Sequence, residues 1–141
     1  MTDPHDLARF VAAQEPVYRA VVEELRAGRK RSHWMWFVFP QLRALGRSPT
    51  AVRYGIGSRD EATAYLDHAT LGPRLRECAR LVAAADGPIE QVMGHVDALK
   101  LRSSMTLFAN TTDDDRDFLD VLDRHYGGEP DPLTVELLGP G

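Results

Sequence analysis

Hydrophobic residues recur through most of this chain at the spacing of amphipathic helices, with polar residues between them. The clearest case is residues 97–109, where Ala98, Leu101, Met105 and Phe108 fall on one helical face. Glycine, proline and capping residues bound the other periodic segments. These patterns predict further helices, in chain order, near residues 3–14, 17–27, 58–66, 72–86, 88–93, 116–126 and 133–138.

The first helix boundaries depend on individual residues. Thr2 or Asp3 can cap the first helix, because a short polar side chain accepts a hydrogen bond from a free N–H group at a helix start. Pro16 disfavours helical geometry in the residue before it. The first two helices therefore either meet near residues 14–16 or form one kinked helix.

One short segment is ambiguous. Residues 34–39 are apolar on every side, so their spacing fits a short buried helix and a short strand equally well. Residues 41–57 follow, and their Pro49 and three glycines predict a loop. No other segment alternates as a strand would. We therefore predict an all-α fold with about seven helices in a single domain over residues 1–141.

Composition narrows the class of protein. The chain has 141 residues, of which 43% are hydrophobic and 27% charged, as in an ordinary globular domain. A net charge of -4 argues against general binding to nucleic acid, which requires an excess of cations. Cys78 is the single cysteine, and we expect it to be a buried, unreactive thiol. With neither a signal peptide nor a membrane-spanning stretch, we expect a cytoplasmic protein that does not contact membranes.

No strong catalytic or metal-binding motif is present. None of the five histidines is paired with another ligand three or four residues away, so we expect no metal site and no cofactor. Gly55-Ile56-Gly57 lacks the rest of a phosphate-binding loop, but its glycines predict a close approach of backbone. Ser58 and Glu61 match a capping box. Because N–H groups at a helix start favour anions, Ser58 is a candidate ligand-binding residue, although most capping boxes bind nothing.

The segment RKRSHWMWFVFPQ, residues 29–41, is the first candidate for chemistry. Arg31 could hold a phosphate or carboxylate group. Trp34 or Trp36 could stack on a flat ring, and His33 could transfer protons near neutral pH. The structural interpretation is that the aromatic residues anchor the core while the cations form a solvated loop. That interpretation fits the tryptophans better than His33, which lies where the apolar run begins.

Residues 97–105 are the second candidate. Asp97, Lys100 and Ser104 fall on one stripe of the predicted helix. Lys100 and Ser104 could bind the same anionic ligand, and Asp97 could act as an acid or base. The simpler interpretation is an exposed ion pair between Asp97 and Lys100, worth roughly 0.2–0.5 kcal/mol. Ser103 and Ser104 are poor helix formers, so their presence in a helix centre suggests close helix packing or a ligand.

Three long blocks of the chain resemble one protein family. They read RSHWMWFVFPQLRALGRS, YGIGSRDEATAYLDHATLGPRLRECARLV and DALKLRSSMTLFA. The chain is similar to the bacterial domain-of-unknown-function 1810 family along nearly its whole length, from DLARFVAAQEPVY to RHYGGEPDPLTVELL. The resemblance implies a small, single-domain, all-helical protein without an established activity. It also implies a glycine-proline or similar turn before the DALKLRSS block, where this chain has GHV.

Two functions from different classes follow from these features. The first is binding or turnover of a small anionic metabolite, such as a nucleotide or an ADP-ribose derivative, in a pocket built from the candidate segments. If the protein is an enzyme, a hydrolase or transferase fits best, because no redox cofactor motif is present. The second is a non-enzymatic interaction module, in which residues 41–57 and 113–117 meet a protein partner. Convergence of His33, Lys100 and Ser104 in one concave pocket would favour the first.

Overall fold

Helices account for the regular structure of the chain. The computed structural model describes residues 3–140, and the predicted all-α fold is confirmed, since no β-strand occurs in that part of the chain. Seven of its ten α-helices have seven or more residues, in agreement with the predicted number of substantial helices. The elements are α1 (Ala8–Gln14), α2 (Tyr18–Arg26), α3 (Met35–Val38), η1 (Arg43–Leu45), α4 (Pro49–Arg53), α5 (Arg59–Asp67), α6 (Leu71–Ala84), α7 (Ile89–Met93), α8 (His95–Ala109), α9 (Arg116–Tyr126) and α10 (Pro132–Leu138).

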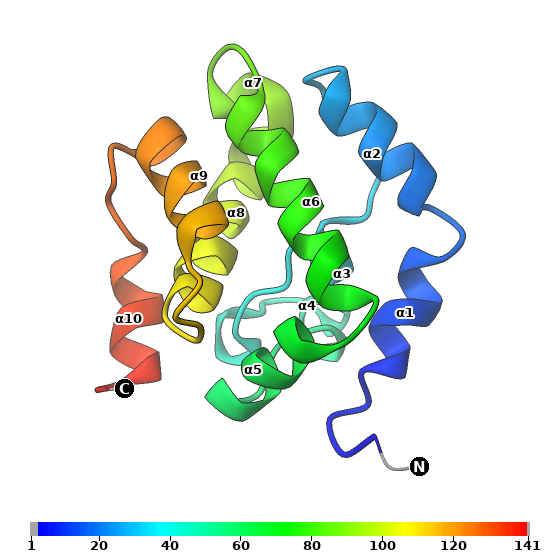
Figure 1. Ribbon diagram of the computed structural model, residues 1–141, viewed down its shortest axis with the longest axis vertical. Helices are drawn as coiled ribbons and strands as arrows, with labels where there is room; N and C mark the ends of the chain where they lie inside the picture. The colour runs from blue at the N-terminus through cyan, green and yellow to red at the C-terminus, as the bar shows by residue number, and fades with distance from the viewer. Residues whose placement is uncertain (1–2, 141) are drawn as a thin grey trace.

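The helices pack around one hydrophobic core (Figure 1). α6 crosses the front of the molecule, with α1 and α2 on one side and α9 and α10 on the other. A line of buried aromatic rings joins these two sides. Phe10 of α1 packs against Tyr65 of α5, with ring centres 5.1 Å apart. Phe108 of α8 continues the line, 5.4 Å from Tyr65 and 5.9 Å from Phe118 of α9. Edge-to-face and tilted aromatic pairs of this kind add to the stability that burial supplies.

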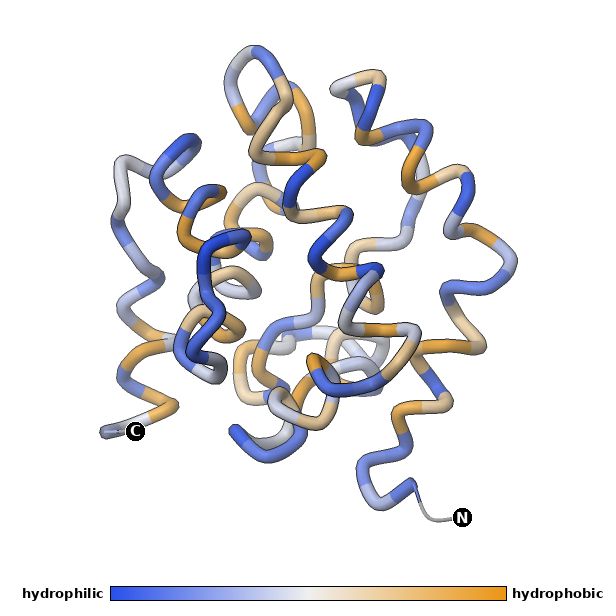
Figure 2. Tube along the Cα trace, in the orientation of Figure 1, coloured by the Kyte–Doolittle hydropathy of each residue, from blue (hydrophilic) through white to orange (hydrophobic). Residues whose placement is uncertain are grey.

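Amphipathic patterning holds for most helices but not for α8. Along α9, apolar residues alternate with polar ones, and Phe118, Val121 and Leu122 are buried (Figure 2). α8 instead contacts α5, α7, α9 and α10, and its residues from Ser103 to Phe108 are all buried. The single apolar face that periodicity predicts for α8 is therefore an underestimate, because neighbours cover the rest of the helix.

The ambiguous apolar run forms a helix rather than a strand. α3 is a single turn, so it leaves several carbonyl groups without a partner inside the helix. The side-chain amide of Gln14 donates a hydrogen bond to the carbonyl of Phe37 at 2.7 Å. The buried Gln14 amide therefore pairs with a carbonyl group that would need a neighbouring strand if this run were itself a strand.

The predicted loop over residues 41–57 is wrong in part, because η1 and α4 lie within it. α4 begins after Ser48, whose hydroxyl accepts a hydrogen bond from the N–H group of Ala51 at 3.2 Å. Pro49 occupies the first helical position, where its missing N–H group costs nothing. A serine followed by a proline is a helix-start signal, and the surrounding glycines obscured it.

The two glycines of the GIG sequence allow a close approach of backbone, as predicted. Leu42 and Ile56 form an isolated parallel β-bridge. A Cβ atom on Gly55 would lie 2.4 Å from the Cα atom of Arg43, which is closer than any real Cβ contact. A Cβ atom on Gly57 would lie 3.1 Å from the nearest nitrogen of the Arg43 guanidinium group. The group that the glycines approach is therefore Arg43.

Local chemistry sets the helix ends. Pro16 separates two helices, α1 and α2, rather than kinking one. The Asp3 carboxylate accepts two backbone hydrogen bonds at the start of α1, at 2.8 and 2.9 Å, while Thr2, the alternative cap, lies outside the described residues. Gly94, with φ +90°, makes the turn between α7 and α8 that the resemblance assigned to a glycine-proline pair.

Cys78 lies fully buried in α6, as predicted for an unreactive thiol. Burial raises the pKa of the Cys78 thiol to about 12, so the reactive thiolate does not form near neutral pH. No helix among residues 3–140 is both long and apolar enough to cross a membrane.

Candidate functional site

Glu24 of α2 holds in place residues 29–34, which we call the opening segment. Its carboxylate accepts hydrogen bonds from the backbone N–H groups of Arg31 and Ser32 at 2.6 and 2.9 Å. It also accepts from the Ser32 hydroxyl at 2.5 Å and from the indole N–H of Trp34 at 3.1 Å. Desolvation raises the pKa of Glu24, but these four hydrogen bonds outweigh it and lower the pKa to about 2. Glu24 therefore fixes the backbone of the segment and leaves the arginine side chains free.

Lys30 fastens the same segment to α8. Its ammonium group lies 3.0 Å from the Asp97 carboxylate and donates to the carbonyl of Ser32 at 2.5 Å. The same ammonium lies 4.9 Å from the centre of the Trp34 ring, and only 7% of the Lys30 side chain is exposed. Asp97 therefore pairs with Lys30, and the simple ion pair between Asp97 and Lys100 does not form.

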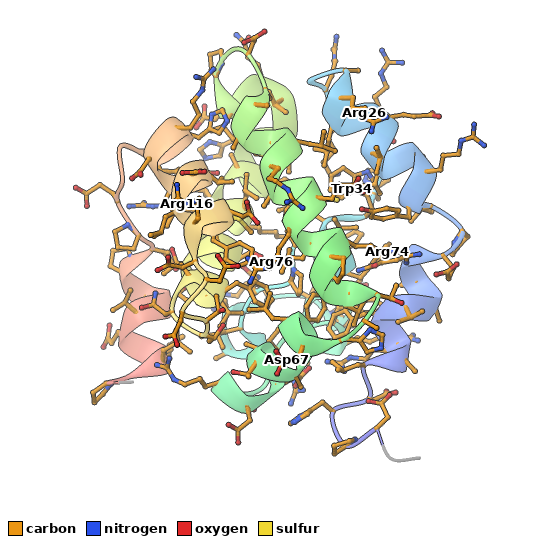
Figure 3. All side chains as sticks on the ribbon, in the orientation of Figure 1. Arg26, Trp34, Asp67, Arg74, Arg76 and Arg116 are labelled. Carbon is orange, nitrogen blue, oxygen red and sulfur yellow. The ribbon has the colours of Figure 1, made fainter. Side chains whose placement is uncertain are left out.

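Trp34 belongs to the core, in agreement with the structural interpretation. It is 1% exposed and lies inside the molecule beside α2 (Figure 3). The side chains of Arg31 and His33, on either side of Ser32, are exposed. Neither makes a side-chain hydrogen bond or ion pair with the part of the chain that the structure describes. Their predicted roles in ligand binding and proton transfer stay predictions.

A narrow slot lies between α3, α4 and α8. Lys100 of α8 covers the Trp36 ring of α3, with its ammonium group 5.5 Å from the ring centre. The free volume of the slot is about 10 Å³, which is about the room one water molecule needs. We call it the Trp36–Lys100 slot. Its lining residues are Met35, Trp36, Phe39, Gln41, Ala51, Tyr54 and Lys100.

The Lys100 ammonium group has no carboxylate partner among residues 3–140, although the lysine is half-buried. Gln41 and Tyr54 bring an amide and a phenol group to the same slot. Neither of these two side chains donates a hydrogen bond within the described residues. A cation on an aromatic face, beside neutral polar groups with free donors, is suited to recognise an anion.

Ser103 and Ser104 follow Lys100 by about one turn and have different environments. The Ser103 hydroxyl donates to the Asp131 carboxylate at 3.2 Å, so it provides the close packing predicted for this pair, here against the start of α10. The Ser104 hydroxyl is fully buried and has no partner in the described residues. Leaving such a group unsatisfied costs roughly 1–3 kcal/mol. Ser104 and Lys100 lie on one face of α8, but Ser104 does not line the slot, so its predicted contact with a ligand stays a prediction.

Ser58 caps α5, as predicted. Its hydroxyl accepts a hydrogen bond from the N–H group of Glu61 at 3.1 Å. The Glu61 carboxylate accepts from Gly57 at 3.0 Å, one residue before the position that a standard capping box uses. The other oxygen of Glu61 pairs with Arg9 at 2.8 Å. The Ser58 hydroxyl is thus engaged in the cap, and its predicted contact with a ligand is not tested.

The structure divides the predicted site residues into separate groups. Trp34 and Asp97 meet at Lys30, whereas Trp36 and Lys100 form the slot. Within residues 3–140, no group of three or more His, Cys, Asp or Glu side chains is arranged to hold a metal ion.

Sequence reasoning missed Lys30, Gln41 and Tyr54. One signal could have drawn attention to their part of the chain. Residues 28–59 hold seven of the 17 Lys and Arg residues and none of the 21 Asp and Glu residues. An acid-free basic stretch in an acidic protein indicates a segment that meets negative charge, either elsewhere in the fold or on a ligand.

Comparison with known proteins agrees with the fold. The chain matches the family described as "Protein of unknown function (DUF1810)" over residues 4–138. It is also similar to a protein of known crystal structure, the conserved hypothetical protein Rv1873 from Mycobacterium tuberculosis, with 65% sequence identity and a TM-score of 0.95. That alignment covers 96% of this chain and 98% of the other. No curated protein matches. On the strength of a family match over nearly its whole length, the chain belongs to the DUF1810 family of proteins of unknown function.

Proposed function

We propose that this protein binds a small anionic metabolite with a flat ring, such as a nucleotide or an ADP-ribose derivative, at the Trp36–Lys100 slot. The observation that carries the proposal is the half-buried Lys100 ammonium group, which lies over an aromatic ring and has no carboxylate partner in the described residues. Partial removal of a charge from water is unfavourable unless another group compensates it. An anionic ligand would supply that compensation and would be bound more tightly for it.

The narrowness of the slot implies that Lys100 moves when a ligand binds. A volume of about 10 Å³ cannot accept a ring while the lysine covers Trp36. A lysine has a long, flexible stem, and its contact with an aromatic ring is worth roughly 0.5–1 kcal/mol at a partly exposed site. Displacement of Lys100 would therefore cost little. The Trp36 face would then be free to stack on the ring while the ammonium group pairs with the anion.

Binding is better supported than turnover. Neither of the two predicted acid–base residues, His33 and Asp97, lines the slot. Asp97 is already paired with Lys30. His33 is exposed on the opening segment. A reaction at the slot would need a group that reaches the ligand, and the neighbouring polar side chains of Gln41 and Tyr54 are better suited to orient it.

A thermal-shift screen tests the proposal. The wild-type protein is heated with nucleotides, NAD, ADP-ribose and sugar phosphates in turn. A ligand present at 100 times its dissociation constant stabilises the folded state by about 2.7 kcal/mol. For a domain of this size that corresponds to a shift of several degrees. We expect a shift with at least one ring-bearing anion, and we expect Lys100→Met to abolish it because the substitution removes the charge and keeps the stem.

Arg47→Met is the matched control, since it removes one cation from an exposed position outside the slot. It should leave the shift unchanged. The proposal fails if no ring-bearing anion stabilises the protein, or if Lys100→Met and Arg47→Met reduce the shift equally. In the second case the ligand responds to overall charge rather than to the slot.

A specific observation makes an interaction module the second candidate. Val96 and Leu99 on α8 are large apolar residues with 61% and 55% of their surface exposed. Leu99 borders an open hollow of about 510 Å³ beside Ile89 and Tyr126. Exposed apolar side chains around a hollow are typical of protein-binding surfaces. A ligand screen without any response would make this surface the leading candidate.

A further inference from the structure

A second, larger hollow lies on the other side of α4. Ala51 and Tyr54 of α4 line the Trp36–Lys100 slot, whereas Val52 and Arg53, on the opposite face of the same helix, line the hollow. Its volume is about 590 Å³, within the range of roughly 300–1,000 Å³ that holds small ligands. The rest of its wall comes from Pro4, His5, Asp6, Arg9, Arg43 and Glu61. We call it the arginine hollow.

Arg9 and Glu61 form a closed ion pair in the wall of this hollow. Their side chains are 12% and 6% exposed, and the guanidinium group lies 2.8 Å from the carboxylate. All five N–H groups of Arg9 donate hydrogen bonds within the protein. The acceptors are the Glu61 carboxylate and the carbonyl groups of His5, Asp6, Arg53 and Gly55. Arg9 therefore has no donor left for a ligand, and it cancels the charge of Glu61.

Arg43 is placed differently from Arg9. Half of its side chain is exposed, and its nearest carboxylate oxygen, on Glu61, is 3.8 Å away, beyond hydrogen-bond distance. The guanidinium group lies against Gly57, where a Cβ atom would approach three of its atoms to within 3.1–3.2 Å. The absence of a side chain at Gly57 thus leaves room for this cation. Within residues 3–140 the guanidinium nitrogens of Arg43 donate no hydrogen bond, so these N–H groups remain available to a ligand.

Arg53 supplies a second free cation at the same hollow. Its guanidinium group lies 5.4 Å from the centre of the Tyr54 ring and donates no hydrogen bond within the described residues. The charges of Arg9 and Glu61 cancel each other. The remaining charged groups in the wall are two arginines, Arg43 and Arg53, and one carboxylate, Asp6. The hollow therefore has an excess of positive charge, with donors on two separate elements.

We propose that the arginine hollow binds a phosphate monoester group, held between the guanidinium groups of Arg43 and Arg53. Guanidinium groups match phosphate oxygens with paired, charge-assisted hydrogen bonds. Two such groups on different elements can contact a tetrahedral dianion from two directions, which a planar carboxylate would use less fully. This site is independent of the Trp36–Lys100 slot, because α4 lies between them and they share no lining residue.

The test is a calorimetric titration with phenyl phosphate at constant ionic strength, with succinate as the dicarboxylate comparison. We expect saturable binding of phenyl phosphate, tighter than that of succinate. Loss of one charge-assisted contact should weaken binding at least about tenfold in Arg43→Gln and in Arg53→Gln. Gly57→Ala should weaken it less, because the new methyl group shifts the Arg43 guanidinium group only slightly while the charge stays the same.

Two controls make the result specific. Arg47→Gln removes an exposed arginine from the same acid-free stretch but from outside the hollow, and it should leave the affinity unchanged. Lys100→Met should also leave it unchanged, so failure of the slot proposal does not decide this one. Absence of saturable phenyl phosphate binding would overturn the inference. Equal loss in Arg47→Gln and Arg43→Gln, or succinate binding as tight as phenyl phosphate, would overturn it as well.

Discussion

Two lysines of this protein lie over tryptophan rings, and they have opposite environments. Lys30 lies 4.9 Å from the Trp34 ring centre, is almost fully buried and pairs with Asp97. Lys100 lies 5.5 Å from the Trp36 ring centre, is half-buried and has no carboxylate partner in the described residues. The two tryptophans are separated by one residue in the sequence, and both lysines contact the same short segment around α3.

The two environments distinguish a charge that stabilises the fold from a charge that can bind a ligand. The charge of Lys30 is fully compensated, by a carboxylate, a carbonyl group and an aromatic face, so it holds the opening segment to α8. Among residues 3–140, the charge of Lys100 has an aromatic ring beside it but no carboxylate partner. A lysine in the first environment contributes to stability, whereas one in the second can bind a ligand without breaking a stronger contact.

The largest expected difference is between the two tryptophans. Trp34→Ala removes a ring that is 1% exposed, and we expect the free energy of unfolding to fall by about 3–5 kcal/mol. Trp36→Ala removes a half-buried ring and should lower the free energy of unfolding by less than about half of that amount. Urea denaturation of both variants measures this. Similar losses at the two positions would mean that Trp36 is as much part of the core as Trp34.

The second difference concerns the lysines. Lys30→Met leaves the Asp97 carboxylate without its partner, and we expect a loss of about 2–3 kcal/mol, below the full range for buried pairs because Asp97 keeps some contact with water. Lys100→Met should change stability by less than about 1 kcal/mol. Adding Asp97→Asn to Lys30→Met should restore part of the loss, since the unpaired charge is then gone. No recovery in the double variant would contradict the pairing.

The smallest expected effect is a change in the pH dependence of stability when Glu24, which holds the opening segment, is replaced. The pKa of Glu24 falls from 4.5 to about 2 on folding, so its contribution is fully present above pH 4.5 and is lost as the pH falls towards 2. Glu24→Gln should therefore lower stability at neutral pH and flatten its decline between about pH 4.5 and 2. Unfolding midpoints across this range provide the measurement. A decline as steep as in the wild type would show that other carboxylates dominate.

Much of the fold was predictable because its signals are local. The capping hydroxyl of Ser58, the break at Pro16 and the apolar set of α9 each act within a few residues of themselves. The short helix α4 was missed for a local reason too, since its serine and proline signal was outweighed by neighbouring glycines. The candidate site was predicted less well. Trp36 and Lys100 were both predicted to line one pocket, but together with His33 and Asp97, which do not line the slot.

Lys30 shows why the site required the fold. In the sequence it is one of three adjacent cations, and the neighbouring Arg31 is an equally plausible ligand contact. Only the packing of α8 against the opening segment buries Lys30 beside Asp97 and leaves the Arg31 side chain in water. Other tertiary contacts bury the Ser104 hydroxyl, which has no partner in the described residues, and bring the Arg43 guanidinium group against Gly57.

The sequence alone was enough for the all-α class, most helix boundaries and the burial of Cys78, whereas it left Trp34 open between the core and a ligand. These depend on periodicity, caps and hydrophobicity, which are properties of single residues and their near neighbours. Tertiary packing, by contrast, sets which lysine has a carboxylate partner within the described residues and which arginines there donate no side-chain hydrogen bond. Those outcomes depend on contacts between segments far apart in the chain, where identical side chains acquire different partners and different exposure to water.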